Sequence, residues 1–187
     1  MAPSYAHPTA LVESESIGNG TRIWAYAHIM PGVQVGAECN ICDHVFIESG
    51  VVVGNNVTLK NQVSLWEGIT VHDDVFIGPN ATFVNDLKPR SARMKEVRER
   101  YAEKKNWLER TVLEHGCSVG ANATILGGLR LGRYCLIAAG ATVTRDVEPF
   151  ALMVGSPARR VGSVCVCGER LDDDVTSSKC RTCEHRH

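Results

Sequence analysis

The sequence predicts an all-β protein, a parallel β-helix built from six-residue repeats. An aliphatic residue occupies every sixth position in two uninterrupted runs, and a small or β-branched residue usually follows it four places later. A period of six fits neither an amphipathic helix nor the strict alternation of a β-sandwich, but it places one inward side chain on each short strand. The first run is Leu11, Ile17, Ile23, Ile29, Val35, Ile41, Ile47, Val53, Leu59, Leu65, Val71 and Ile77, and the second is Leu113, Val119, Ile125, Leu131, Ile137 and Val143.

Glycine and asparagine recur where this helix needs corners. They occur together in Gly18-Asn19, Gly54-Asn55-Asn56 and Gly78-Pro79-Asn80. Glycine accepts positive φ without strain, and an asparagine side chain hydrogen-bonds to nearby backbone. Aromatic residues make up only 6% of the chain, which suits a narrow interior filled by aliphatic stacks.

The repeat is interrupted between residues 84 and 112. This insertion predicts a loop followed by a short helix, since Met94, Val97, Tyr101 and Leu108 form a partial apolar face. From Asn85 to Arg110 it holds nine basic and five acidic residues. Two interpretations remain open: a solvated excursion that packs on the coils, or a lid over an active site that binds phosphorylated ligands.

The chain divides into a β-helix domain, residues 1–148, and a C-terminal extension, residues 149–187. Its 20 basic and 21 acidic residues give no general electrostatic attraction to nucleic acid or to an anionic membrane. We find no apolar run long enough for a signal peptide or a membrane span, so we expect a cytoplasmic protein with reduced thiols.

The repeats resemble those of the hexapeptide-repeat acyltransferases, over about residues 5–160. The resemblance implies a left-handed β-helix with three repeats per coil, so that residues 18 apart stack on neighbouring coils. It also implies a homotrimer that binds coenzyme A between subunits. In the segments GANATILGG (120–128) and AAGATVTRD (138–146), the backbone near Ala121, Ala139 and Gly140 would contact the pantetheine arm.

A further segment, ALMVGSPARRVG (151–162), resembles the coenzyme-binding segment that follows the last coil in this family, with Ser156 in place of a commoner asparagine. Arg159 and Arg160 would then bind the coenzyme phosphates. The alternative is that both arginines are simply exposed, solubilising charges.

The segments CNICDHVFIE (39–48), SLWEGITVHDDVFIGPNATFVND (64–86) and PRS (89–91) narrow the resemblance. They are similar to N-acetyltransferases that use acetyl-CoA to acetylate the 3-amino group of a nucleotide-linked sugar. A dTDP-3-amino-3,6-dideoxyhexose is the favoured acceptor, and a UDP-linked 3-amino-glucuronate derivative is the alternative. An O-acetyltransferase of the same fold and a non-catalytic scaffold subunit are further alternatives.

Candidate catalytic residues lie at the start of the insertion. Glu67 and Asn85 are 18 residues apart and should stack, and Asp86 follows Asn85. We expect Glu67 or Asp86 to accept or orient the amine proton, and Asn85 to donate a hydrogen bond to the sugar or the thioester oxygen. An amine needs little base assistance once it is neutral. Alternatively, these residues only cap backbone groups at a corner.

Two residues are candidates for binding the nucleotide sugar. They are His44, in the CDHVF segment, and Arg90, in the PRS segment. His115 is the candidate base if the acceptor is a hydroxyl. The middle histidines, His28, His44, His72 and His115, are separated by 16, 28 and 43 residues, so they lack the closely spaced pair that the zinc site of a γ-class carbonic anhydrase, which shares this fold, would need.

The eight cysteines fall into groups. Cys39, Cys117 and Cys135 occupy the small inward position of the repeat, so we expect them in the core, whereas Cys42 has no assigned role. The remaining four resemble a small zinc ribbon, with Gly168 forming a knuckle turn and His185 or His187 as possible substitutes for a ligand. A flexible tail without metal is the alternative. These four cysteines are Cys165, Cys167, Cys180 and Cys183.

Overall fold

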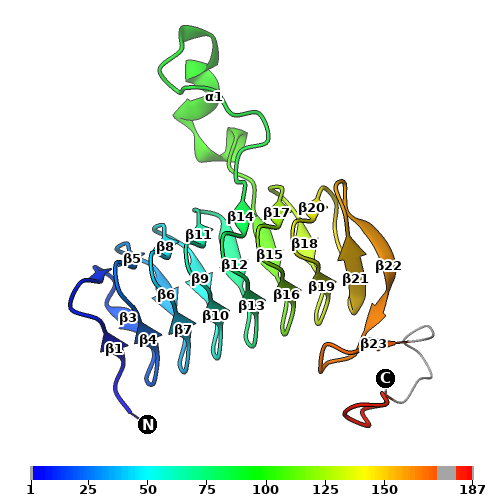
Figure 1. Ribbon diagram of the computed structural model, residues 1–187. Helices are drawn as coiled ribbons and strands as arrows, with labels where there is room; N and C mark the ends of the chain where they lie inside the picture. The colour runs from blue at the N-terminus through cyan, green and yellow to red at the C-terminus, as the bar shows by residue number, and fades with distance from the viewer. Residues whose placement is uncertain (1, 172–179, 187) are drawn as a thin grey trace.

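A computed structural model describes residues 2–171 and 180–186 of the chain. It is a parallel β-helix in which short strands stack in three sheets along one axis (Figure 1). We name them sheets A, B and C, in the order in which each coil visits them. The predicted all-β fold is therefore confirmed.

Each sheet takes one strand from every coil. Sheet A contains β1 (Tyr5–Ala6), β4 (Arg22–Ile23), β7 (Asn40–Ile41), β10 (Thr58–Leu59), β13 (Phe76–Ile77), β16 (Ser118–Val119), β19 (Leu136–Ile137), β21 (Ala151–Val154), β22 (Arg159–Val164) and β23 (Arg170–Leu171). Sheet B contains β2 (Leu11–Val12), β5 (His28–Ile29), β8 (Phe46–Ile47), β11 (Ser64–Leu65), β14 (Thr82–Phe83), β17 (Thr124–Ile125) and β20 (Thr142–Val143). Sheet C contains β3 (Ser16–Ile17), β6 (Gln34–Val35), β9 (Val52–Val53), β12 (Ile69–Val71), β15 (Thr111–Leu113) and β18 (Arg130–Leu131).

The turns between sheets form three edges, which we call AB, BC and CA. Most turns place one residue at positive φ, and on the AB edge these residues include Tyr26, His44 and Gly140. Residues 18 apart pair on neighbouring coils; for example, Thr58 pairs with both Asn40 and Phe76. The three-repeat coil expected from the resemblance is therefore present.

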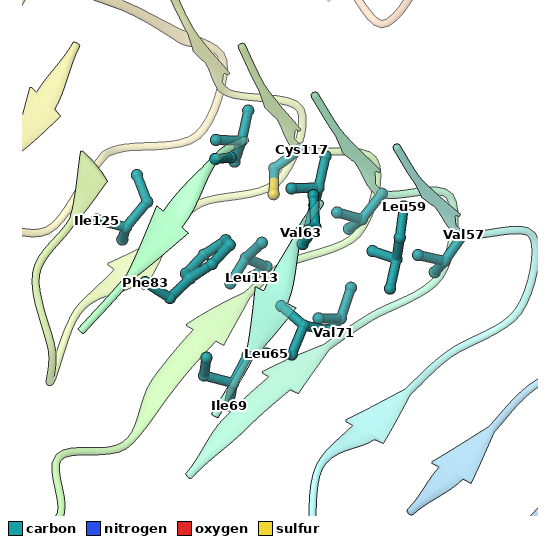
Figure 2. Close-up of a cluster of buried hydrophobic side chains, with 14 of the residues drawn as sticks. Val57, Leu59, Val63, Leu65, Ile69, Val71, Phe83, Leu113, Cys117 and Ile125 are labelled. Carbon is teal, nitrogen blue, oxygen red and sulfur yellow. The ribbon is translucent and has the colours of Figure 1, made fainter. Parts of the chain in front are cut away.

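The core is the aliphatic stack that the repeat predicts. Figure 2 shows Val57, Leu65, Val71 and their neighbours packed between the strands of three sheets. The expected core cysteines, Cys39, Cys117 and Cys135, are all buried. Burial raises the pKa of Cys39, and hydrogen bonding to Cys135 together with burial raises that of Cys117 well above its usual range, so both thiols stay protonated and unreactive.

The prediction that Leu11 points inward is wrong. Leu11 pairs with the outward residue His28 and is 54% exposed, whereas Val12 pairs with the inward residue Ile29. These partners are 17 residues apart because Ile17 follows Val12 by five positions instead of six. The first coil is thus one residue short, and a slip of one position turns a strand's side chains to the other face.

The insertion leaves the helix between β14 and β15, at the BC edge, and projects away from the coils (Figure 1). It contains η1 (Lys95–Val97), the predicted short helix α1 (Arg98–Ala102) and η2 (Lys104–Asn106), none of which buries a residue. We call residues 84–110 the arm. Across it Val71 pairs with Leu113, 42 residues away, which is 24 more than the usual 18. Since 24 is a multiple of six, the repeat resumes in frame.

The C-terminal extension continues sheet A beyond the last coil. β21 is parallel to β19, β22 is antiparallel to β21, and β23 is antiparallel to β22. We call residues 151–171 the cap. Within the described residues, no helix is long and apolar enough to span a membrane.

Candidate functional site

The predicted stacking of Asn85 on Glu67 is present at the BC edge. Asn85 Nδ2 donates a 3.2 Å hydrogen bond to the Glu67 carbonyl oxygen, and the Glu67 backbone N–H donates a 2.7 Å bond to the Glu48 carboxylate. The Glu109 backbone N–H donates to the Asn85 carbonyl oxygen at 2.9 Å. The two ends of the arm are thereby joined next to Glu67.

Asp86 holds the arm together. Its carboxylate accepts hydrogen bonds from the Tyr101 hydroxyl at 2.6 Å and the Lys88 backbone N–H at 2.9 Å, and it pairs with the Arg100 guanidinium. Burial alone would raise the pKa of the Asp86 carboxyl, but the bonds from Tyr101 and Lys88 and the Arg100 cation together lower it below its ordinary value. A carboxylate so stabilised is a weak base.

Glu67 makes an ion pair between the coils and the arm. Its Oε1 lies 2.7 Å from Lys104 Nζ, and its side chain is 28% exposed. Leu108 packs beside Gly68 at the same corner. Glu67 is thus an accessible carboxylate beside a cation, at the base of the arm.

The two candidate residues for binding the nucleotide sugar lie apart. Arg90 is on the arm, where its backbone N–H donates to the Tyr101 hydroxyl oxygen at 2.9 Å and its side chain is exposed. His44 is on the AB edge, exposed and stacked on Tyr26 with ring centroids 5.1 Å apart. Within one chain His44 and Glu67 do not come together, because His44 lies on the AB edge and Glu67 lies on the BC edge.

The candidate pantetheine contacts lie on the AB edge of successive coils. The Gly140 backbone N–H donates to the Ala121 carbonyl oxygen at 2.8 Å, and Ala139 is exposed. Space is open around Gly140, since a Cβ added there would meet nothing within 4 Å. On the CA edge, by contrast, Asn55 Oδ1 accepts from the Ala37 N–H. Ala121 and Ala139 on the AB edge have no side-chain oxygen that could accept a hydrogen bond from a backbone N–H in the same manner.

The two arginines of the cap differ in their surroundings. Arg160 pairs with Glu148 at 2.6 Å and donates to Ser163 Oγ at 2.9 Å, so it braces β22. Arg159 is exposed and donates to the carbonyl oxygen of its neighbour Ala158 at 3.0 Å. Of the two, Arg159 has the guanidinium more readily offered to a phosphate.

A third group, on the CA edge, surrounds His115. His115 Nε2 lies 2.9 Å from the Tyr134 hydroxyl oxygen and 3.4 Å from Asp74 Oδ2, beside a hollow lined by Thr70, His72 and other residues. Sequence reasoning named His115 but missed Asp74 and Tyr134. Asp74 and His115 are 41 residues apart in the sequence. When the 24 extra residues of the arm are subtracted, the separation is 17 residues, about one coil, so the six-residue register could have predicted that they lie close together.

The four tail cysteines come together beside the cap. Their Sγ atoms all lie within 4.8 Å of one another, with 3.5 Å between Cys165 and Cys183 and 3.6 Å between Cys167 and Cys180. Within the described residues this group contains no histidine; His185 is not a member of it, and His187 lies outside the part of the chain that is described.

Comparison with known proteins defines the class. The profile of bacterial hexapeptide transferases (six repeats) matches residues 16–49 and 110–145. The dTDP-3-amino-3,6-dideoxy-α-D-galactopyranose 3-N-acetyltransferase of Aneurinibacillus thermoaerophilus is 46% identical over 167 residues, covering 89% of this chain and 82% of that protein. The chain therefore belongs to the hexapeptide-repeat acetyltransferases, and it is an acyltransferase.

Solved structures agree on the fold. The acetyltransferase domain of PglB from Neisseria gonorrhoeae superposes with a TM-score of 0.56 at 18% identity, covering 85% of this chain and 58% of that one. A mutant of AntD, an N-acyltransferase from Bacillus cereus in complex with dTDP and coenzyme A, gives a TM-score of 0.54 at 16% identity, covering 86% and 83%.

Proposed function

We propose that this protein transfers the acetyl group of acetyl-CoA to the 3-amino group of a nucleotide-linked amino sugar, with a dTDP-3-amino-3,6-dideoxyhexose as the favoured acceptor. The observation that carries the proposal is the 46% identity to a 3-N-acetyltransferase over 89% of the chain. The segments of residues 39–48, 64–86 and 89–91, which include Glu67, Asn85 and Asp86, support the same acceptor class.

The chemistry requires little from the protein beyond positioning. The neutral amine nitrogen attacks the thioester carbonyl carbon, the C–S bond breaks, and the proton that the nitrogen loses passes by way of Glu67 to the departing thiolate. Glu67 would orient the amine and take up its proton, because its carboxylate is accessible at the base of the arm. Asn85 uses one amide hydrogen on the Glu67 carbonyl oxygen and has a second to offer the sugar or the thioester oxygen.

Asp86 has a different role in this proposal. Its carboxylate is occupied by Tyr101, Lys88 and Arg100, so it would position the arm, and Arg90 with it, over the acceptor. A positive arm suits a diphosphate, since arginine and lysine make charge-assisted bonds with phosphate oxygens. This role corresponds to the lid interpretation of the insertion.

Coenzyme A would lie along the AB edge, with its pantetheine arm against Ala121, Ala139 and Gly140 and its phosphates near Arg159. We further propose a homotrimer with the active site between subunits. The Glu67 group lies on the BC edge of one chain, whereas His44 and the pantetheine contacts lie on its AB edge, so a neighbouring chain would bring an AB edge to a BC edge. The arm buries none of its helical residues and exposes Leu87 and Met94, as expected of a segment that packs on a neighbour.

We place the enzyme in the cytoplasm. All eight cysteines are free of disulfides, including the exposed Cys167 and Cys183. Free thiols in such number suit a reducing compartment.

A second candidate function rests on the CA edge. A histidine beside a carboxylate is the arrangement of a general base, and His115 lies 3.4 Å from Asp74. This pair would activate a hydroxyl acceptor, and it favours an O-acetyltransferase as the alternative.

The proposal is tested by following coenzyme A release with a thiol reagent. A dTDP-3-amino-3,6-dideoxyhexose should turn over faster than a UDP-linked 3-amino-glucuronate derivative, and light scattering should give three times the 20.4 kDa chain mass. Turnover with neither amino sugar would refute the acceptor class, and a monomer with full activity would refute the site between subunits.

A further inference from the structure

The tail cysteines form a built cluster that the transferase chemistry does not use. They come from two tight turns, one after β22 and one at the end of the described chain. In the first, the Gly168 N–H donates to the Cys165 carbonyl oxygen at 2.8 Å, with Gly168 at a φ of +88°. In the second, the Glu184 N–H donates to the Cys180 carbonyl oxygen at 3.0 Å. Each turn presents two thiols to the same point.

The sulfur separations fit metal coordination better than disulfides. A disulfide brings sulfur atoms to about 2.05 Å, whereas the sulfur atoms of Cys165 and Cys183 lie 3.5 Å apart and those of Cys167 and Cys180 lie 3.6 Å apart. Four thiolates in a tetrahedron about Zn²⁺, with Zn–S of about 2.3 Å, lie about 3.8 Å apart. All four Sγ atoms lie within 4.8 Å of one another, so small side-chain movements bring them to the corners of that tetrahedron.

The chemistry of the ligands also determines which metal ion this group would bind, because it offers four thiols and no carboxylate. Thiolates select soft or borderline cations, whereas Mg²⁺ and Ca²⁺ take oxygen ligands. Four protein ligands leave no open position for water or substrate, which is the mark of a structural site.

We propose that Cys165, Cys167, Cys180 and Cys183 bind one structural Zn²⁺ that fastens the last strands of sheet A. Cys165 directly follows β22, and β23 lies between the two pairs of ligands. The metal therefore ties the β22–β23 hairpin to the chain end, where sheet A would otherwise present an unprotected edge.

The local core shows why the segment around β23 needs a metal. Ala151, Met153 and Ala158 of the cap belong to the main core, whereas the buried cluster around β23 consists of Cys165, Leu171 and Cys180, with Val166 partly buried against it. Two of the three buried residues are ligands, so apolar burial alone gives this segment little stability. Metal binding in such a small core is coupled to its folding.

The first test is the metal content of the whole protein, purified from zinc-containing medium without chelators and measured by inductively coupled plasma mass spectrometry. We expect one zinc per chain, and less than a tenth of that in the double variant Cys180→Ser/Cys183→Ser. The matched control is Cys42→Ser, a buried cysteine outside the cluster, which should keep its zinc. The proposal would be overturned if the purified protein contained no zinc, whether these four cysteines reacted as free thiols with a thiol reagent or formed disulfides with one another.

A second measurement works even if the double variant does not fold. Replacing zinc by Co²⁺ in the natural chain should give the strong sulfur-to-cobalt charge-transfer absorption and the visible bands of a tetrahedral thiolate site. On chelation, hydrogen exchange should accelerate in residues 159–171 while the coils from β4 to β20 stay protected. Octahedral cobalt spectra, or a cap equally protected without metal, would contradict the site whatever the acceptor of the enzyme proves to be.

Discussion

Asn85 lies directly over Glu67 on the neighbouring coil and donates a 3.2 Å hydrogen bond from Nδ2 to the Glu67 carbonyl oxygen. The contact lies where the arm leaves the β-helix, so Glu67 is held beside the long interruption of the repeat. If the acceptor binds here, each residue of the group has a separable effect.

Replacing Glu67 by glutamine keeps the shape of the side chain and removes its charge. We expect kcat/KM for the amino sugar to fall by about 10²-fold, because the amine loses the group that orients it and takes up its proton. Coenzyme A affinity, measured by calorimetry, should not change. The matched control is Glu13→Gln, an exposed carboxylate that pairs with His28 in the first coils, which should retain full activity.

The pKa of Asp86 predicts an acid-sensitive arm. Because the folded-state pKa is lowered, the carboxylate contributes its full stability above the unfolded value of about 3.9, and loses it as the pH falls through the lower folded value. Trp107, whose ring centroid lies 5.8 Å from that of Tyr101, reports on this region. In a Trp24→Phe/Trp66→Phe background, Trp107 fluorescence should shift below about pH 4.

The variant Asp86→Asn is the companion to that titration. It should show the low-pH Trp107 signal already at neutral pH, since the amide cannot pair with Arg100 as the carboxylate does. The far-ultraviolet circular dichroism of the coils should be unchanged. A normal pH titration of Trp107 in this variant would show that Asp86 does not anchor the arm.

The slipped first coil gives a matched pair of leucines. Leu113→Ala removes a side chain that is 0% exposed in the stacked core and should lower the free energy of unfolding by about 2–5 kcal/mol. Leu11→Ala, at a position that the repeat alone would call equivalent, should cost less than about 1 kcal/mol because that side chain already faces water. Urea unfolding measures both, and equal losses would contradict the outward orientation of Leu11.

Most of the fold could be predicted from the sequence because a single six-residue period determines the β-helix. Every coil repeats the same inward positions, so strand order, register and core follow once the frame is known, as the 0% exposure of Ile29 and Ile77 illustrates. The frame failed at Leu11 because a deletion of one residue leaves no mark in a sequence where aliphatic residues occupy both positions 11 and 12. The resumption at Leu113 was visible because the insertion is a multiple of six.

The site was less predictable for a physical reason. Spacing of 18 placed Asn85 on Glu67, but it gave no indication that Tyr101 and Arg100 would occupy the Asp86 carboxylate, since the fold of the arm follows no repeat. The pairing of His115 with Asp74 was hidden by the insertion between them. Assembly between chains is not encoded in the repeat of one chain at all.

Blocking the AB edge tests the coenzyme position. Ala139→Trp places a large ring at an exposed corner and should weaken coenzyme A binding at least about tenfold, since the pantetheine arm needs close approach to the backbone. Asn61→Trp is the matched control, at the same exposed corner position three coils away. Calorimetric titration of both variants decides, and similar losses or no loss in either would place the coenzyme elsewhere.

The most direct test of the central claim compares the 3-amino sugar nucleotide with its 3-hydroxy analogue, in the natural enzyme and in His115→Ala, with the acetylated position assigned by nuclear magnetic resonance. We predict acetylation at the 3-nitrogen, little or no product from the hydroxy analogue, and retention of most N-acetyl transfer without His115. Efficient O-acetylation that disappears in His115→Ala would contradict the account and establish the alternative site around His115 and Asp74.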